Sequence, residues 1–408
     1  MKSDVLPTDP PLTDPTLAET AVPTPTETFQ SDQVFTIAGA HFAHDTFSAF
    51  LAPLLPLLQE RLNTNYALTG GLTIYSQLPS LLNPFIGYLA DKVSLRYFII
   101  FAPAVTATLM SSMGFTSNYL TLALLLLAAG VSIAAFHSPA PAMVGRVSGR
   151  QVGKGMSIFM ASGELGRTLG PVIAVAAVNQ WALEGIWRLA FVGWAVSGIL
   201  YLRLRNISAR PMQKDHAALS AFWPKARRIF TILTWIMVAR VFMLVALTTY
   251  LPIFMRDVRE STLWLAAASL TILEAAGVVG ALLTGTLSDR VGRRRMLTFL
   301  LGMAPLLLVA FLYSPGWLLI PLLLGLGLTA ITTQPVLLAV VQDEFPQHRA
   351  LANGTFLGIS FLVRAGAVWI VGMWADRFGL TQAFLWSGLA AWVSLPAIWL
   401  LPQRAKIG

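Results

Sequence analysis

The sequence predicts an all-α integral membrane protein of twelve transmembrane helices, arranged as two six-helix halves. Apolar residues make up 56% of the 408 residues and charged residues only 12%, against roughly 45–50% and 25% in soluble domains. The apolar residues gather in stretches long enough to cross a bilayer, and features of the first half of the chain recur in the second half. These three observations together define the fold class.

A bilayer core about 30 Å thick needs roughly 20 apolar residues per helix. The chain contains twelve such stretches, separated by charged residues or by clusters of Gly and Pro. They are expected at 34–58, 67–90, 97–116, 119–142, 153–178, 186–204, 229–254, 263–286, 296–313, 317–341, 350–374 and 380–402.

The distribution of positive charge orients these helices. If both termini are cytoplasmic, 20 of the 28 Lys and Arg residues fall in the tails and the even-numbered connections, and the outer connections hold five, namely Arg61, Arg188, Arg256, Arg259 and Arg377. Cytoplasmic loops of membrane proteins carry such an excess. The sequence therefore predicts a multi-pass protein of the inner (cytoplasmic) membrane with both termini cytoplasmic. Membrane topology then accounts for the net charge of +9, and no nucleic-acid partner is expected.

Segments outside the apolar stretches divide the chain. Residues 1–33 contain six prolines and no apolar run, which predicts a disordered cytoplasmic tail. This tail also lacks the basic start and apolar core of a secretory signal. The longest basic connection, 205–228, is expected to be a cytoplasmic linker between the bundles 34–204 and 229–402, and residues 403–408 a second cytoplasmic tail.

The two halves look like duplicates. Residues 87–96 read GYLADKVSLR and residues 285–295 read GTLSDRVGRRR, so that a Gly and an Asp each recur at an offset of 198. Pro139 and Pro335, late in the fourth and tenth stretches, recur at an offset of 196. Repeated halves of six spans are typical of secondary transporters that bind cargo between the halves.

Six ionisable side chains lie near the middle of their stretches: Asp45, Glu164, Arg167, Arg240, Glu274 and Arg364. A charge at that depth costs about 2.5–3.5 kcal/mol on insertion scales, so these residues are expected to pair or to face an aqueous cavity. Three acids and three arginines sum to zero, which permits pairing.

Glu164 and Arg167 stand three residues apart, close enough to meet on one helix face. They could form a self-neutralising structural pair. Alternatively, Glu164 could take up a proton when Arg167 is drawn away, because a nearby cation favours the charged carboxylate. The nearby Gly163, Gly166 and Gly170 permit close approach of another helix.

Helix 34–58 carries a polar stripe at three- and four-residue spacing: His41, His44, Asp45 and Ser48. An Asp one turn from a His is a plausible proton relay, since His titrates near neutral pH. A hydrogen-bonded seam that only fixes helix packing is the alternative. The run does not match the His-Glu-x-x-His zinc helix, and the chain has no cysteine ligands, so no metal site is predicted.

The second half contributes Glu274 and Arg240, which could pair, and Arg364 as a third cation. The planar guanidinium suits carboxylate or phosphonate groups, so an anionic or zwitterionic cargo is one interpretation and structural neutralisation of Glu274 is the other. His137 precedes Ser138 and Pro139 and could either support a Pro-bent helix end or contact cargo.

The Gly-x-x-x-Asp-(Lys/Arg) pattern with further basic residues, present in both halves, resembles the cytoplasmic signature of the major facilitator superfamily. Four stretches resemble the fosmidomycin-resistance branch of its drug:proton antiporters: AHFAHDTFSAFLAPLLPLLQ (40–59), AAFHSPAPAMVGRVSGRQVGKGMSIFMASGELGRTLGP (134–171), QDEFPQHRALANGTFLG (342–358) and WADRFG (374–379). The chain departs from that branch at Ser138 and Pro139 and around Glu164, where substrate would sit, so the cargo could differ.

The resemblance implies proton-coupled export of a small molecule or drug by alternating access, by a monomer that uses the proton gradient and no cofactor. Uptake of a small anionic or zwitterionic solute and a non-transporting receptor remain alternatives. An enzyme is not expected, because the chain has no Gly-x-Ser-x-Gly elbow and no zinc helix.

Three groups of site residues follow. The expected proton-coupling residues are Asp45, Glu164, Glu274, His41 and His44. The expected substrate-binding residues are Arg167, Arg240, Arg364 and His137. By the resemblance, the inner gate is formed by Gly87, Asp91, Lys92, Arg96, Gly285, Asp289, Arg290 and Arg293.

Overall fold

The computed structural model describes residues 28–402 apart from 84, 87–88, 90–92, 150, 208–221 and 346–348. In this part of the chain, every regular element is helical. The elements that precede the linker are α1 (Ser31–Ser48), α2 (Leu51–Leu62), α3 (Tyr66–Gln77), η1 (Leu78–Leu82), α5 (Arg96–Ser111), η2 (Met113–Phe115), α6 (Tyr119–His137), α7 (Ala140–Val147), α8 (Val152–Gly185), η3 (Ile186–Leu189) and α9 (Ala190–Leu204).

The elements that follow the linker are α10 (Phe222–Val245), η5 (Ala246–Tyr250), α11 (Leu251–Asp257), α12 (Leu263–Val291), α13 (Arg293–Tyr313), η6 (Gly316–Leu318), α14 (Leu319–Leu326), η7 (Gly327–Ile331), α15 (Thr333–Glu344), α16 (Arg349–Phe378), α17 (Leu380–Trp392) and α18 (Ser394–Leu400). Helix α1 begins at Ser31, three residues before the predicted start of the first stretch at residue 34.

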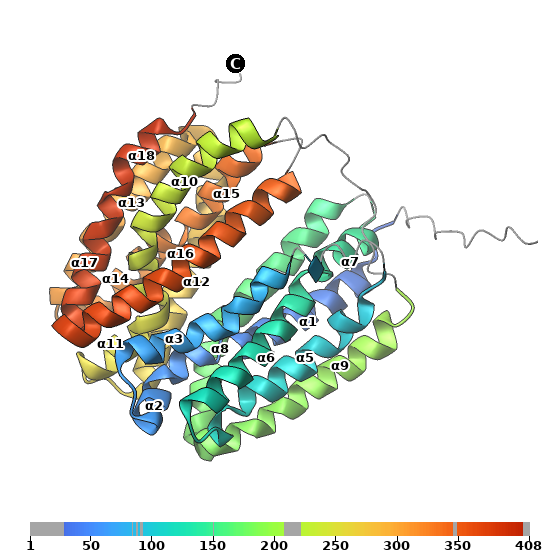
Figure 1. Ribbon diagram of the computed structural model, residues 1–408. Helices are drawn as coiled ribbons and strands as arrows, with labels where there is room; N and C mark the ends of the chain where they lie inside the picture. The colour runs from blue at the N-terminus through green and yellow to red at the C-terminus, as the bar shows by residue number, and fades with distance from the viewer. Residues whose placement is uncertain are drawn as a thin grey trace, which may run out of the picture.

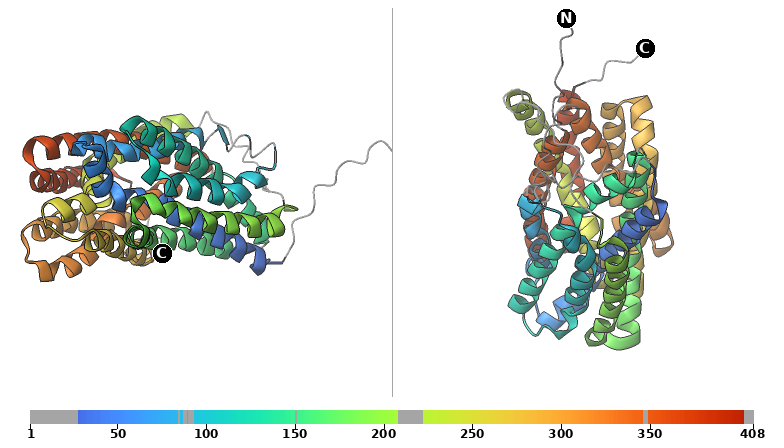
Figure 2. Two further views of the ribbon diagram at one scale, coloured as in Figure 1. Left: turned by 90° about the horizontal axis from the view of Figure 1, so that it is seen from below. Right: turned by 90° about the vertical axis from the view of Figure 1, so that its right-hand side faces the viewer.

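The helices form two bundles. Figures 1 and 2 show α1–α9 in one bundle and α10–α18 in the other, and the start of α1 and the end of α18 lie toward the same end of the molecule. We term this the termini end and the opposite end the far end. The bundles lie against each other at the far end, where α2, α3 and α11 meet, and diverge toward the termini end.

Nine of the described helices are long and apolar enough to cross a membrane by length and composition. One of them, Lys154–Leu204, comprises both α8 and α9. Large apolar side chains such as Trp317 (76% exposed) and Leu202 (73% exposed) point outward, as expected for a surface covered by lipid rather than water. The chain is a multi-pass membrane protein, and the described residues of each predicted stretch are largely helical.

Local sequence signals begin and end several helices. The side chains of Asn65, Asn118 and Thr262 accept hydrogen bonds from the amide three residues later at the starts of α3, α6 and α12, the usual role of these residue types at a helix N-cap. Gly292 (φ 98°) ends α12 and Gly379 (φ 85°) precedes α17. Both have left-handed backbone angles that glycine adopts without a steric penalty.

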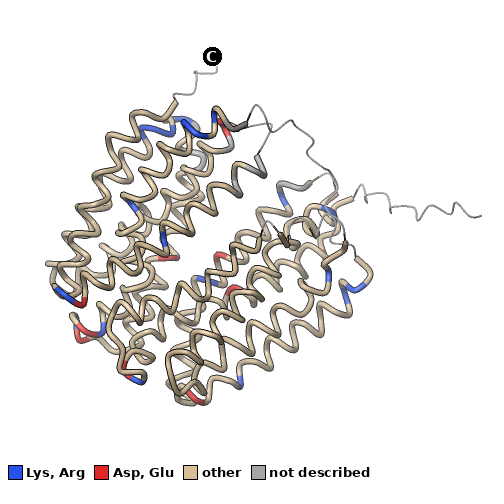
Figure 3. The backbone as a smooth tube through the Cα atoms, in the orientation of Figure 1, with Lys and Arg blue, Asp and Glu red and all other residues tan. Residues whose placement is uncertain are grey.

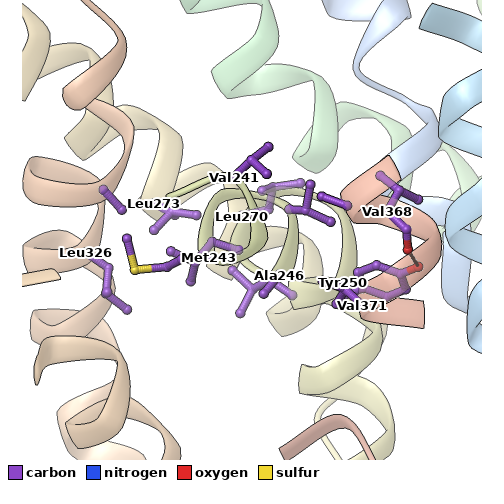
Figure 4. Close-up of a cluster of buried hydrophobic side chains, with 14 of the residues drawn as sticks. Val241, Met243, Ala246, Tyr250, Leu270, Leu273, Leu326, Val368 and Val371 are labelled. Carbon is purple, nitrogen blue, oxygen red and sulfur yellow. Dashed lines mark hydrogen bonds between the residues drawn. The ribbon is translucent and has the colours of Figure 1, made fainter. Parts of the chain in front are cut away.

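Two segments, η5 and η7, are π-helical, a rare conformation that occurs mostly as single turns within α-helices. Segment η5 lies in the core of the second bundle. Figure 4 shows this core, in which the Tyr250 hydroxyl donates a 2.8 Å hydrogen bond to the Val368 carbonyl of α16. A π turn changes the direction in which the following side chains point. Here Thr248 and Thr249 face Arg364 of α16.

Helix α8 packs along α1, as the glycine spacing predicts. A Cβ at Gly166 would overlap the Phe42 carbonyl, and a Cβ at Gly163 would overlap the His41 ring. At Gly170 it would lie 2.7 Å from the Thr46 carbonyl. The glycine stripe of α8 therefore lets the two helices approach closely enough for their polar side chains to meet.

The two bundles are joined at the far end by what we term the far-end contact: Tyr66, Ala67, Asp257 and Asp376. The Asp376 carboxylate of α16 accepts hydrogen bonds from the backbone amides of Tyr66 (2.7 Å) and Ala67 (3.1 Å) at the start of α3. The Tyr66 hydroxyl donates to Asp257 of α11 at 2.9 Å. A carboxylate at a helix N-terminus is favourable because the first amides lack helical partners and the helix dipole is positive there.

Candidate functional site

The predicted midplane charges lie in the interior of the molecule. Figure 3 shows a small group of charged residues in the middle of the two bundles, apart from those at the two ends. Five side chains of the first bundle form what we term the central cluster: His41 and Asp45 from α1, His137 from α6, and Glu164 and Arg167 from α8.

Asp45 is the hub of the central cluster. Its side chain is only 1% exposed, with Oδ2 3.4 Å from His41 Nε2 and 3.3 Å from Arg167 Nη1. The other oxygen, Oδ1, lies 3.2 Å from His137 Nε2. A buried carboxylate is costly unless cations or hydrogen-bond donors stabilise it. Arg167 donates to Asp45 here, and the two histidine nitrogens are its other close neighbours.

Arg167 links Asp45 to Glu164. It forms the predicted salt bridge with Glu164 on the same face of α8, and its other terminal nitrogen reaches Asp45 on α1. Both side chains of the α8 pair remain partly exposed, Arg167 by 42% and Glu164 by 37%. The pair is therefore not sealed in the protein interior but borders accessible space.

The polar stripe predicted on α1 is buried, and its two histidines lie in different surroundings. His41 stacks on Phe159 of α8 with ring centroids 3.9 Å apart and belongs to the central cluster. His44 stacks on Phe136 of α6 at 4.4 Å, and neither of its ring nitrogens has a hydrogen-bond partner among the described residues. His44 thus packs beside the cluster, and its proton-coupling role stays a prediction.

The two interior arginines of the second bundle, Arg240 and Arg364, are held by neutral groups. Arg240, only 4% exposed, donates to Thr333 Oγ1 at 2.6 Å and to Gln334. Arg364 donates to Thr248 at 3.0 Å and to Thr249 at 3.3 Å. The threonine partners lie in η5 or just after η7, so the two π-helical segments position both arginines.

Glu274 of α12 does not form the salt bridge with Arg240 considered from the sequence. Among the described residues, neither Arg240 nor Arg364 has a carboxylate within salt-bridge distance. Arg240 is turned toward α15 instead. Glu274 interacts electrostatically with Arg364 in its own bundle and with Arg167 and Glu164 across the boundary between the bundles.

The predicted gate is described only in part. Gly87, Asp91 and Lys92 lie outside the described residues. Gly285 and Asp289 are described only in their helical backbone. Arg96 lies over the Tyr97 ring at 5.2 Å, and Arg290 is exposed. Arg293 contacts Ser288 and lies 3.3 Å from Asp343. Its role in a gate stays a prediction.

Sequence reasoning missed the far-end contact, although a signal for it exists. Gly372, Asp376 and Arg377 repeat the Gly-x-x-x-Asp-(Lys/Arg) pattern of residues 87–92 and 285–290 a third time, at the far end of α16. Gly372 is needed there because a Cβ would overlap the backbone of Ala67. The pattern therefore marks a place where α16 and α3 touch.

Comparison with known proteins agrees with this architecture. A family model described as Major Facilitator Superfamily matches residues 37–368. The fosmidomycin resistance protein of Escherichia coli is 21% identical over 377 residues, covering 91% of this chain and 93% of that protein. A probable 4-methylmuconolactone transporter of Cupriavidus pinatubonensis is 24% identical, with 79% and 78% covered.

Solved structures share the fold. A bacterial homolog of the human lysosomal transporter Spinster, in an inward-facing and occupied conformation, superimposes with a TM-score of 0.78 at 15% identity and covers 91% of this chain and 97% of its own. The nucleoside transporter NupG superimposes with a TM-score of 0.73 at 14% identity, with 90% and 99% covered.

Proposed function

The chain belongs to the major facilitator superfamily, and on that premise we propose that it is a proton-coupled secondary transporter that exports a small molecule by alternating access. It would act as a monomer in the inner (cytoplasmic) membrane with both termini cytoplasmic, the orientation favoured by its positive charges. The far-end contact would then close the outer side, so that the site would open toward the cytoplasm at the termini end.

The observation that carries the proposal is that Arg167 of one bundle interacts with acids of both bundles. It bonds to Glu164 and Asp45 beside it and interacts electrostatically with Glu274 across the boundary. When the bundles move relative to each other, these distances must change. An acid that loses a nearby cation binds a proton more readily, and this exchange would couple proton movement to the change of state.

The two interior arginines of the second bundle, Arg240 and Arg364, support an anionic or zwitterionic cargo. Their hydrogen-bond partners in the described structure are neutral, and Arg240 Nε is buried without a partner. A guanidinium that is not neutralised by a bonded carboxylate is suited to receive a carboxylate or phosphonate of the cargo. His137, one third exposed, and Arg167 would complete the substrate-binding residues from the other bundle.

Export is favoured over uptake by the name of the Escherichia coli relative, because resistance to a compound is consistent with its removal from the cell. The arginines would serve uptake of an anionic solute equally well, so uptake is the second candidate. A membrane receptor that does not transport is the third. Flux measurements separate the three.

The deciding experiment follows the pH inside proteoliposomes while a panel of anionic and zwitterionic compounds is added. Substrate-evoked proton movement is expected with the wild-type protein and should be lost with Glu164→Gln and with Glu274→Gln. Glu184→Gln is the matched control. Glu184 lies near the end of α8, beyond the break at Ala182, and its side chain is 58% exposed and pairs with Arg61.

Each outcome has a meaning. Proton and cargo movement in opposite directions supports export by antiport, and movement in the same direction supports uptake. Cargo flux without proton movement would refute coupling. Unchanged coupling in both glutamine variants would exclude Glu164 and Glu274 as the coupling acids.

A further inference from the structure

Three side chains of the central cluster converge on one point. His41 Nε2 lies 3.3 Å from His137 Nε2 and 3.4 Å from an oxygen of Asp45, and His137 Nε2 lies 3.2 Å from the other oxygen. We term these residues the His-Asp-His triad. The spacing of four residues places His41 and Asp45 on one face of α1, and His137 approaches that face from the last residue of α6.

Both histidines are oriented by their other ring nitrogen. His41 Nδ1 lies 2.7 Å from the Phe159 carbonyl and His137 Nδ1 lies 3.0 Å from the Ile133 carbonyl. A carbonyl oxygen only accepts hydrogen bonds, so each Nδ1 carries a hydrogen and each neutral ring presents an unprotonated Nε2 to the shared point. This backbone contact is the arrangement that positions metal-binding histidines.

With neutral rings, the two histidines therefore present only acceptors to the shared point, and Arg167 donates to Asp45 Oδ2 from the side of α8. Two imidazole lone pairs face a carboxylate, and Asp45 Oδ1 is buried without a hydrogen-bond partner among the described residues. Acceptors this close repel one another unless a proton or a metal ion lies between them. One ring nitrogen from each histidine and one oxygen of Asp45 lie within 4.8 Å of one another. Small side-chain adjustments would bring these three atoms to a common ion with bonds of about 2.0–2.1 Å.

We infer that the His-Asp-His triad binds a divalent transition-metal ion, with Zn²⁺ the best match. Two imidazoles and one carboxylate suit Zn²⁺ and its neighbours, whereas Ca²⁺ and Mg²⁺ prefer sites made wholly of oxygen ligands. The inference is independent of export and of proton coupling, because it concerns binding alone.

The surroundings are compatible with a bound cation. The formal charges of Asp45, Glu164 and Arg167 sum to one negative charge, and the salt bridge to Glu164 offsets the repulsion that Arg167 would exert. His137 is 33% exposed, which leaves a side from which the ion can enter and a fourth ligand, water or a donor atom of a cargo molecule, can bind.

All three ligands belong to one bundle. Helices α1 and α6 lie together in the first bundle, so movement of the bundles against each other leaves the triad intact. The site should therefore bind metal in detergent solution without a gradient or a cargo, and this allows a direct test.

The test uses the full chain, purified through a tag without histidine and freed of metal by a chelator. Titration with Co²⁺ should produce the visible absorption of a tetrahedral cobalt complex, saturating at one ion per chain and displaced by Zn²⁺. His137→Ala and Asp45→Asn should each weaken Co²⁺ binding at least about tenfold, since even changes to groups that support metal ligands cost that much.

His44→Ala is the matched control. His44 is next to Asp45 in the sequence, but its imidazole stacks on Phe136. Its removal should leave the cobalt spectrum and the affinity for Co²⁺ unchanged. Far-UV circular dichroism and size-exclusion profiles establish that each variant is folded. His137→Gln replaces His137→Ala if the latter is not.

Two results would overturn the inference. One is the absence of a saturable cobalt spectrum in the wild-type protein. The other is a spectrum that persists in folded His137 and Asp45 variants, which would place the metal at other histidines. Neither result depends on transport, so loss of proton flux and loss of metal binding are distinguishable failures.

Discussion

At the scale of the residue, the site depends on how closely α8 approaches α1. Gly166 faces the Phe42 carbonyl, and Gly163 faces the His41 ring. These contacts bring Arg167 to Asp45 at 3.3 Å. A side chain at either glycine would have to push the helices apart, and the central cluster would then lose its geometry.

We therefore expect Gly166→Ala to destabilise the protein by about 1–3 kcal/mol, the usual cost of adding a methyl group to a packed interface. The measurement is the thermal unfolding midpoint in detergent. Gly366→Ala is the matched control, because Gly366 also lies within a long helix but a Cβ there meets nothing within 4 Å. Its expected change is less than about 1 kcal/mol. Equal decreases of the unfolding midpoint in both variants would show that the close approach of α8 to α1 is not the cause of the destabilisation.

Contacts between residues close together in the sequence could be predicted, whereas contacts between residues far apart in the sequence could not. Glu164 and Arg167 pair as predicted because three-residue spacing on a helix fixes their proximity. His137 joins His41 and Asp45 from a position nearly a hundred residues away in the chain, and no local pattern specifies the rotation of α6 that brings it there. The same holds for Arg240, whose partners Thr333 and Gln334 lie on α15.

At the scale of the element, the membrane-spanning helices could be predicted because each needs a long apolar run. The π-helical turns that interrupt these helices could not be predicted. The sequences of η5 and η7 carry no signal for a π turn, yet these turns place threonines beside the two interior arginines. Their conformation depends on what packs around them, as Tyr250 illustrates by bonding to α16.

The far-end contact is the other element-scale feature, and Asp376 is its centre. Replacing Asp376 by Ala leaves the first amides of α3 without their acceptor on α16. A carboxylate at a helix N-terminus contributes about 0.3–1 kcal/mol, so we expect a shift of roughly twofold to fivefold toward the state that is open at the far end.

Distances between spin labels at Glu60→Cys and Arg377→Cys measure this shift, and the chain has no cysteine of its own. Both label positions are exposed and lie in α2 and α16 near the far end. Glu260→Gln, a change of an exposed acid near the same end, is the control and should leave the distances unchanged. A distance distribution unaffected by Asp376→Ala would exclude a gating role for this carboxylate.

At the scale of the whole molecule, transport by alternating access requires the far-end contact to open in every cycle. A short thiol-specific cross-linker with a disulfide in its spacer, placed between Tyr66→Cys on α3 and Asp257→Cys on α11, would join the two bundles where their side chains now share a 2.9 Å hydrogen bond. Cross-linking should abolish cargo flux in proteoliposomes, and reduction should restore it. The pair Arg61→Cys and Glu184→Cys is the control, because these residues form a 2.6 Å salt bridge within the first bundle and their linkage leaves the bundles free to move. Flux that survives complete cross-linking of the first pair would mean that the far end stays closed during transport, which is incompatible with two bundles rocking about a central site.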